Sequence, residues 1–194
     1  AKGALRSGIG LLTIHLPFLN NAIVQTAVPE AMTEIDVHDT CFSAEVDTDD
    51  YQAVAIGPGL GQSRITEKAL LDQLVITTSP MVIDADALNL LSANKNYLNK
   101  LPKGSILTPH PKELERLVGK CNTSYERLQR ACELSAKANV HIVLKGAYTA
   151  IIQPSGEVCF NTTGNPGMAT GGSGDVLTGI LLALLAQGYD ADSA

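Results

Sequence analysis

The residues best suited to chemistry lie in a glycine-rich stretch at positions 161–175, which reads NTTGNPGMATGGSGD. An apolar run at helical spacing, Val176 to Ala186, follows it and predicts a largely buried helix. A glycine-rich loop that opens a helix leaves backbone N–H groups unpaired at the positive end of the helix dipole. Glycine also lets the backbone approach a phosphate, because it has no Cβ. The stretch therefore predicts a phosphate-binding loop.

Asp175 closes this loop and admits two interpretations. A carboxylate beside a phosphate repels it, which suits a base that removes a proton from an attacking hydroxyl better than it suits simple binding. Alternatively, Asp175 only caps the helix, a common role for aspartate. The spacing favours the phosphate loop with Asp175 as its base.

The motif Gly57-Pro58-Gly59-Leu60-Gly61 follows the apolar run 52–56. It is not the dinucleotide fingerprint, which needs two residues before its third glycine. The motif either brings backbone close to a ligand or makes a tight turn from strand to helix.

Two aspartates, Asp84 and Asp86, follow the apolar run Met81 to Ile83. Carboxylates at such a place can reach Mg²⁺ or a ribose in phosphoryl-transfer sites. For Asp86 the favoured interpretation is a helix N-cap before Ala87 and Leu88.

The motif Thr108-Pro109-His110-Pro111 places a histidine between two prolines, which restrict the backbone and hold the imidazole. A functional role for His110 is favoured over a structural one, because a rigid loop presents it. Glu113 is close enough to hold a metal-bound water, but a solvated glutamate at a helix start is the favoured interpretation.

The motif Lys145-Gly146-Ala147-Tyr148-Thr149 ends another apolar run. Lys145 could meet a phosphate, and Tyr148 could pack on a base. The alternative is a β-turn with an exposed lysine.

These motifs need a scaffold, and strand-like and helix-like segments alternate along the chain. The predicted strands are nearly continuous apolar runs, which is typical of a parallel sheet covered by helices on both faces. Segments 149–153 and 157–160 alternate around Pro154-Ser155-Gly156 and predict a hairpin. Because ligands bind at the carboxyl edge of such sheets, the motifs are expected to share one cleft.

Composition narrows the function classes. The 194 residues suit a single α/β domain, 1–194, and the net charge of −6 argues against a nucleic-acid binder. The four cysteines have no Cys-x-x-Cys pair, which indicates reduced thiols in a cytoplasmic protein. No apolar run reaches membrane-spanning length. The chain begins within a helix-like segment without an initiator Met, so a fragment missing both ends is expected.

Taken together and in order, the motifs at 57–61, 84–89, 108–111, 145–149 and 172–175 resemble those of the ADP/ATP-dependent NAD(P)H-hydrate dehydratases. The resemblance covers essentially the whole chain. It implies a ribokinase-like three-layer αβα fold, with a mostly parallel sheet and an edge hairpin. It also implies a lyase that repairs (S)-NADH or (S)-NADPH hydrate, with ADP or ATP as co-substrate and Mg²⁺ on the phosphates.

Site residues carry over from the resemblance motif by motif. Asp175 would deprotonate the substrate hydroxyl, and the N–H groups of Gly172, Ser173 and Gly174 would hold the moving phosphoryl group. Gly59 and His110 would line the hydrate pocket together with Asp175. The adenine nucleotide would bind Gly174 and the segment Lys145, Gly146, Ala147, Tyr148 and Thr149, and no protein ligand for a metal is assigned.

The resemblance further implies a homo-oligomer and, in many members, fusion to an N-terminal epimerase domain. Two other functions stay open. One is a ribokinase-like kinase of the hydroxymethylpyrimidine or hydroxyethylthiazole type, with the same loop and a stable phosphorylated product. The other is a nucleotide-sensing module without catalysis, against which the intact Asp175 and His110 speak.

Overall fold

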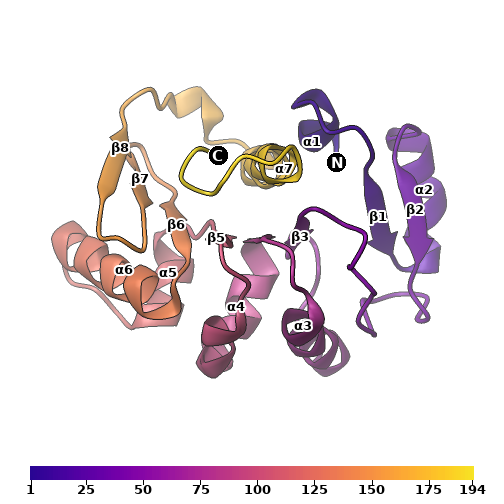
Figure 1. Cartoon of the computed structure of the whole chain (residues 1–194), viewed down its shortest axis with the longest axis horizontal. Helices are drawn as coiled ribbons and strands as arrows, with labels where there is room; N and C mark the ends of the chain where they lie inside the picture. Colours follow the sequence, from indigo (N-terminus) through magenta and orange to yellow (C-terminus); the bar gives the residue numbers. More distant parts are fainter.

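Strands and helices alternate along most of the chain in the computed structural model, which describes all 194 residues (Figure 1). The strands are β1 Thr13–Leu16, β2 Met32–Ile35, β3 Val54–Ile56, β4 Met81–Ile83, β5 Ile106–Leu107, β6 His141–Leu144, β7 Thr149–Ile152 and β8 Val158–Asn161. The α-helices are α1 Lys2–Arg6, α2 Asn21–Ala27, α3 Arg64–Ile76, α4 Ala85–Ala93, α5 Pro111–Val118, α6 Ser124–Ala138 and α7 Ser173–Ala186. Three short 3₁₀ helices lie at η1 Phe18–Asn20, η2 Lys95–Lys100 and η3 Pro166–Met168.

The main sheet has six strands in the order β3-β4-β5-β6-β7-β8. Strands β3 to β6 are parallel, with Val54 opposite Met81 and Ile83 opposite Leu107. Strands β7 and β8 pair antiparallel as the hairpin at one edge, with Ala150 opposite Phe160. The predicted mostly parallel sheet with an edge hairpin is therefore confirmed.

Strands β1 and β2 form a separate parallel pair, with Thr13 opposite Met32. The alternation of strand-like and helix-like segments did not predict a pair separate from the main sheet. In Figure 1 this pair lies with α2 at one end of the molecule, beyond β3. Strand order depends on contacts between distant segments, which local periodicity does not encode.

Helices cover both faces of the main sheet, as Figure 1 shows. Helices α3 to α6 lie on one face over an apolar cluster of 18 buried residues, which includes Leu70, Ile83, Leu114 and Ile142. Helix α7 packs on the other face through Leu181 and Leu185. The predicted three-layer αβα architecture is confirmed.

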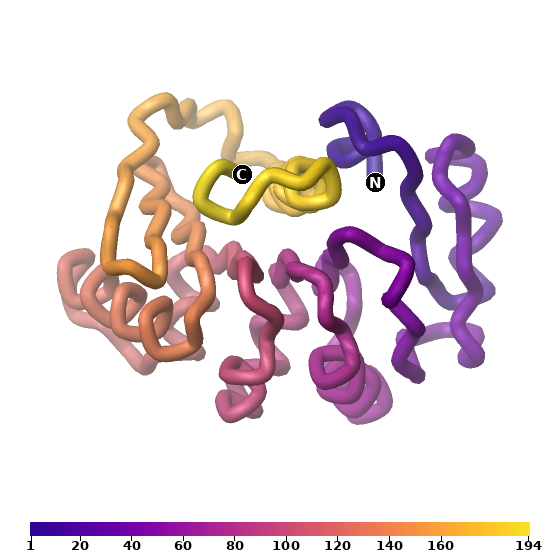
Figure 2. The backbone as a smooth tube through the Cα atoms, viewed as in Figure 1, coloured from indigo at the N-terminus to yellow at the C-terminus, as the bar shows by residue number.

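Helix α1 lies beside α7, close to the marked N-terminus in Figure 2. The contact depends on two glycines. A Cβ at Gly3 would lie 2.8 Å from the carbonyl oxygen of Val176, and one at Gly179 would lie 2.9 Å from the backbone nitrogen of Ala4. No helix is both long and apolar enough to cross a lipid bilayer.

Candidate active site

Helix α7 begins three residues earlier than the apolar run predicted, at Ser173, with Gly172 as its N-cap at φ +86°. The N–H groups of Gly172, Gly174 and Asp175 donate to no backbone carbonyl, whereas that of Ser173 donates to Thr170 at 3.3 Å. Asp175 is the third helical residue and is exposed, and no side chain caps this helix. The alternative interpretation of Asp175 as a helix cap is therefore wrong.

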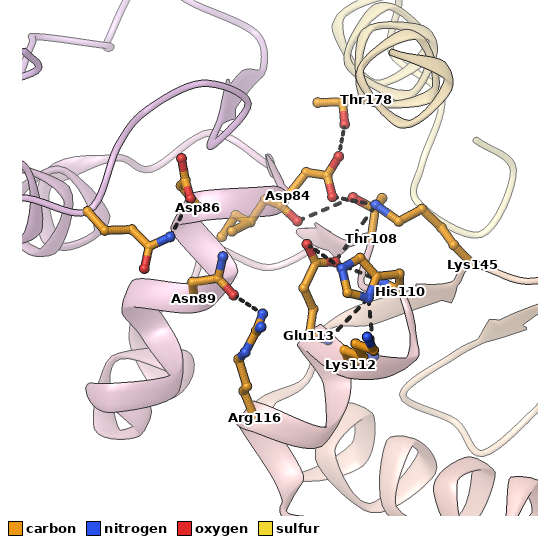
Figure 3. A network of polar contacts seen from close by, with 12 residues as sticks. Asp84, Asp86, Asn89, Thr108, His110, Lys112, Glu113, Arg116, Lys145 and Thr178 are labelled. Carbon is orange, nitrogen blue, oxygen red and sulfur yellow. Dashed lines mark hydrogen bonds and ion pairs between the residues drawn. The ribbon is translucent and has the colours of Figure 1, made fainter. Parts of the chain in front are cut away.

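A buried ion pair lies at the carboxyl ends of β4 and β6. The Lys145 ammonium donates to Asp84 Oδ1 at 2.7 Å, and Thr178 Oγ1, from the first turns of α7, donates to Asp84 Oδ2 at 2.9 Å (Figure 3). Asp84 is only 1% exposed, and the Lys145 side chain is mostly buried. The alternative of an exposed turn lysine is therefore wrong.

The glycine loop lies directly against this pair. A Cβ built on Gly174 would be 3.5 Å from Lys145 Nζ and 3.8 Å from Asp84 Oδ2. A larger residue at Gly174 would therefore take space beside the ammonium. The unpaired N–H groups at the start of α7 and the lysine charge come together at one place, and both attract anions.

His110 and Glu113 cap helix α5 reciprocally. His110 Nδ1 accepts from the backbone N–H of Lys112 at 3.1 Å, and Glu113 Oε2 accepts from the N–H of His110 at 2.8 Å. Glu113 is 6% exposed and its Oε2 lies 3.9 Å from Lys145 Nζ, so the expectation of a solvated glutamate was wrong. The His110 side chain is 44% exposed and so remains open to a ligand.

The Gly57–Gly61 motif forms the turn between β3 and α3, which confirms the structural interpretation for Gly57. A Cβ on Gly57 would lie 1.8 Å from the carbonyl oxygen of Asp84, so only glycine fits. Gly59 has φ +67°, and a Cβ built on it would meet no atom within 4 Å.

Asp86 is the second residue of α4 rather than its cap, because Asp84 holds the N-cap position. Its carboxylate instead accepts from the backbone N–H of Gly61 at 3.0 Å and from Gln62 Nε2 at 2.6 Å. The favoured interpretation of Asp86 as a helix cap is therefore wrong. Asp86 fastens the Gly57–Gly61 turn to α4, on the opposite side of Asp84 from Lys145 in Figure 3.

The segment from Lys145 to Thr149 makes a turn between β6 and β7, in which Thr149 Oγ1 donates to the carbonyl of Gly146 at 3.1 Å. The glycine-rich loop returns to this turn, since a Cβ on Gly164 would be 2.5 Å from the carbonyl oxygen of Ala147. Tyr148 is exposed, so its ring is available for stacking.

The predicted site segments thus gather at the carboxyl ends of β3 to β6 and at the start of α7. Thr178 is a member that the sequence analysis did not single out. It is the only polar side chain in the apolar run 176–186, and a polar residue in such a run signals a buried partner.

The sequence of the chain is similar to those of known proteins. A family model described as NAD(P)H-hydrate dehydratase matches residues 1–194. The bifunctional NAD(P)H-hydrate repair enzyme of Moorella thermoacetica is 38% identical over 203 residues, which cover 97% of this chain and 37% of that protein. The ADP-dependent (S)-NAD(P)H-hydrate dehydratase of Bacillus subtilis is 37% identical over 185 residues, which cover 94% of this chain and 64% of that protein.

The fold of the chain is also similar to that of a solved structure. The ADP/ATP-dependent NAD(P)H-hydrate dehydratase of Bacillus subtilis, co-crystallised with ATP and Mg²⁺ and soaked with CoA, superimposes with a TM-score of 0.81 at 34% identity. The match covers 98% of this chain and 69% of that one. The chain spans well under half the length of the bifunctional relatives that it matches.

Proposed function

Because the chain belongs to the NAD(P)H-hydrate dehydratase family, we propose that it returns (S)-NADH hydrate or (S)-NADPH hydrate to the intact cofactor while consuming ADP or ATP. One observation carries the proposal. Gly174, whose N–H is one of those left free at the start of α7, lies against the Lys145 ammonium, and Asp175 follows it directly. This arrangement suits transfer of a phosphoryl group to a hydroxyl.

The chemistry follows from the poor leaving ability of hydroxide. Asp175 takes the proton of the ring hydroxyl, and the hydroxyl oxygen bonds to the terminal phosphorus of the nucleotide as the bond to the departing nucleotide breaks. The N–H groups of Gly172 and Gly174 and the Lys145 ammonium hold the phosphoryl group, and the Ser173 N–H joins them on leaving the Thr170 carbonyl. Phosphate then leaves with the electrons of the C–O bond, and the neighbouring ring carbon loses a proton, which restores the double bond.

The two ligands approach this point from different elements. Gly59 and His110 line the hydrate pocket on the side of β3 and α5, and the open space at Gly59 supports this placement. The nucleotide binds the turn of Lys145, Gly146, Ala147, Tyr148 and Thr149, with Gly174 between the two ligands.

Mg²⁺ enters with the phosphates of the nucleotide in this proposal. No group of three metal-ligating side chains gathers here, and both oxygens of Asp84 already accept hydrogen bonds. We therefore assign no protein ligand to Mg²⁺, an ion that usually binds through substrate phosphates and water.

The wider setting is also part of the proposal. We expect a cytoplasmic homo-oligomer, with small molecules rather than nucleic acids or membranes as partners. Fusion to an N-terminal epimerase domain is expected in the full protein, since bifunctional relatives are matched over only part of their length.

The test follows product formation. The purified protein is incubated with hydrated NADPH, Mg²⁺ and either ADP or ATP, and the near-ultraviolet absorbance of reduced nicotinamide is recorded. The proposal predicts an absorbance rise that requires the nucleotide, with one phosphate released per NADPH formed. A phosphorylated product that persists without the absorbance rise would show the kinase alternative instead.

A further inference from the structure

The carboxylate of Asp84 has an unusual place for a residue at a helix N-terminus. It stands at the N-cap of α4, yet its side chain does not cap that helix. Instead, its two carboxylate oxygens accept hydrogen bonds from Lys145 and Thr178 (Figure 3). These residues lie 61 and 94 positions away in the sequence. Asp84 thus joins the ends of β4 and β6 to the first turns of α7.

Stability alone explains this arrangement poorly. Removing a carboxylate and an ammonium from water costs free energy that their attraction in the interior only about offsets, and apolar residues of similar size often serve equally well. A buried pair of this kind therefore fits a role in placing one of its members. Lysine needs such placement, because its long side chain has many rotamers and its ammonium is a point charge without directional preference.

The atom that is placed is Lys145 Nζ. It lies 2.7 Å from Asp84, 3.9 Å from Glu113 Oε2 and 3.5 Å from the Cβ position of Gly174. Two carboxylates thus lie near the ammonium, which also lies beside Gly174 at the start of α7. Thr178 fixes Asp84 Oδ2, which leaves Oδ1 for the lysine.

We propose that Asp84 is the positioning residue of Lys145, holding its ammonium against the start of α7 where the phosphoryl group is transferred, and that Thr178 fixes the carboxylate. This inference rests on the proposed function. In this proposal Asp84 acts through Lys145 and contacts neither the substrate nor a metal ion. This role differs from the contact with Mg²⁺ or a ribose that its position after β4 had suggested.

A double-mutant cycle on dehydration of NADPH hydrate with ADP tests the inference. Asp84→Asn keeps the shape of the side chain but removes its charge, so the lysine loses its fixed position. We expect kcat to fall about 10- to 100-fold, the size of effect that misplacement of a reacting group produces. The KM for ADP is expected to stay within about threefold, since the substitution leaves the rest of the nucleotide turn, Gly146 to Thr149, unchanged. In a Lys145→Met background the same substitution is expected to change kcat less than about twofold.

The exposed pair of Lys68 and Asp72, 2.6 Å apart on α3, supplies the matched control. Asp72→Asn also removes a carboxylate from a lysine pair and is expected to leave kcat unchanged. Thermal midpoints of all variants are recorded, because a purely structural role would lower the midpoint and would reduce kcat equally in both backgrounds. Equal losses in both backgrounds, or a kcat of Asp84→Asn within twofold of the wild type, would overturn the inference.

Thr178→Val gives a second test if Lys145→Met does not fold. It replaces the hydroxyl by a methyl group and leaves the ion pair intact. A kcat loss of about 3- to 10-fold at constant KM for ADP supports the arrangement, and an unchanged kcat overturns it. A wild type that forms no NADPH with any nucleotide refutes the proposed function itself, whereas an active wild type with an unaffected Asp84→Asn refutes only this inference.

Discussion

The His110 imidazole has two roles, and a single substitution to alanine would remove both at once. Its Nδ1 caps α5, and its side chain remains partly exposed at the edge where the hydrate is proposed to bind. His110→Ala removes both the cap and the ring. His110→Asn removes the ring but keeps a side chain that is among the best N-caps.

We expect His110→Asn to raise the KM for the hydrate at least about tenfold, the equivalent of one lost hydrogen bond, while the KM for ADP changes little. Its thermal midpoint should stay near that of the wild type. His110→Ala should also lower the midpoint by about 2–4 °C, because loss of an N-cap costs about 1 kcal/mol. Steady-state kinetics and thermal melts check both. Equal increases in the KM of the two substrates would remove His110 from the hydrate pocket.

At the residue scale the sequence predicted which side chains lie at the carboxyl ends of the strands better than it predicted their contacts. His110, Lys145 and Asp84 were singled out because they follow buried strands. The ion pair of Lys145 with Asp84, and the burial of Glu113, depend on strand ends that meet only in the folded sheet. Local sequence does not encode contacts between distant strand ends, so exposure was an open alternative for Lys145 and the favoured interpretation for Glu113.

The turn between β3 and α3 requires glycine at position 57. Gly57 has φ +131°, and its missing Cβ leaves room for the carbonyl oxygen of Asp84. Gly61, in the same turn, also has positive φ, at +80°, but open space around it. A side chain at Gly61 would meet backbone strain alone, whereas one at Gly57 would also clash with Asp84. Comparing substitutions at the two positions therefore distinguishes the steric effect from the strain.

Gly57→Ala is expected to destabilise the protein by about 3 kcal/mol or more, because the new methyl group forces backbone to move. Gly61→Ala should cost only about 1 kcal/mol, the price of a left-handed alanine. Urea unfolding of the two variants gives both values. Equal losses would mean that the contact between Gly57 and Asp84 is not close.

The loop after β2 is held by hydrogen bonds to the buried carboxylate of Asp36. Burial by itself would raise the pKa of Asp36, but hydrogen bonds from Ser43, His15 and His38 outweigh it and lower the pKa to about 2. A depressed carboxyl pKa stabilises the fold above the unfolded value of about 4, and this contribution disappears as the pH falls toward 2.

Asp36→Asn is therefore expected to lower the free energy of unfolding by about 1–2 kcal/mol at pH 7 and to have little effect near pH 2. Urea unfolding of both proteins across this range measures the difference. A penalty that stays constant down to pH 2 would show that the charge of Asp36 is not the cause.

Elements were the most predictable level. Nearly continuous apolar runs marked β4 and β6, and both strands form there. The start of α7 was predicted too late, because the glycine of Ser173-Gly174-Asp175 is a poor helix former on its own. Packing of the rest of α7 against the sheet and α1 overrides that weak preference.

At the scale of the whole molecule, the alternation of strands and helices was enough to predict a parallel sheet covered on both faces. It was also enough to predict that motifs after successive strands share one edge, because carboxyl ends of parallel strands align. The separate β1–β2 pair and the order of the strands were not predictable, since they depend on long-range contacts. The common edge, however, is the feature on which the proposed function depends.

Replacement of Asp175 tests this account most directly. Asp175→Asn is compared with the wild type for NADPH formation from its hydrate and for ADP binding by calorimetry. The control is Asp50→Asn, an exposed aspartate before β3, at the opposite end of that strand from Gly57. The account predicts that Asp175→Asn lowers kcat at least about 10³-fold, keeps the Kd for ADP within about threefold, and that the control is unaffected. Near-normal turnover by Asp175→Asn would contradict it.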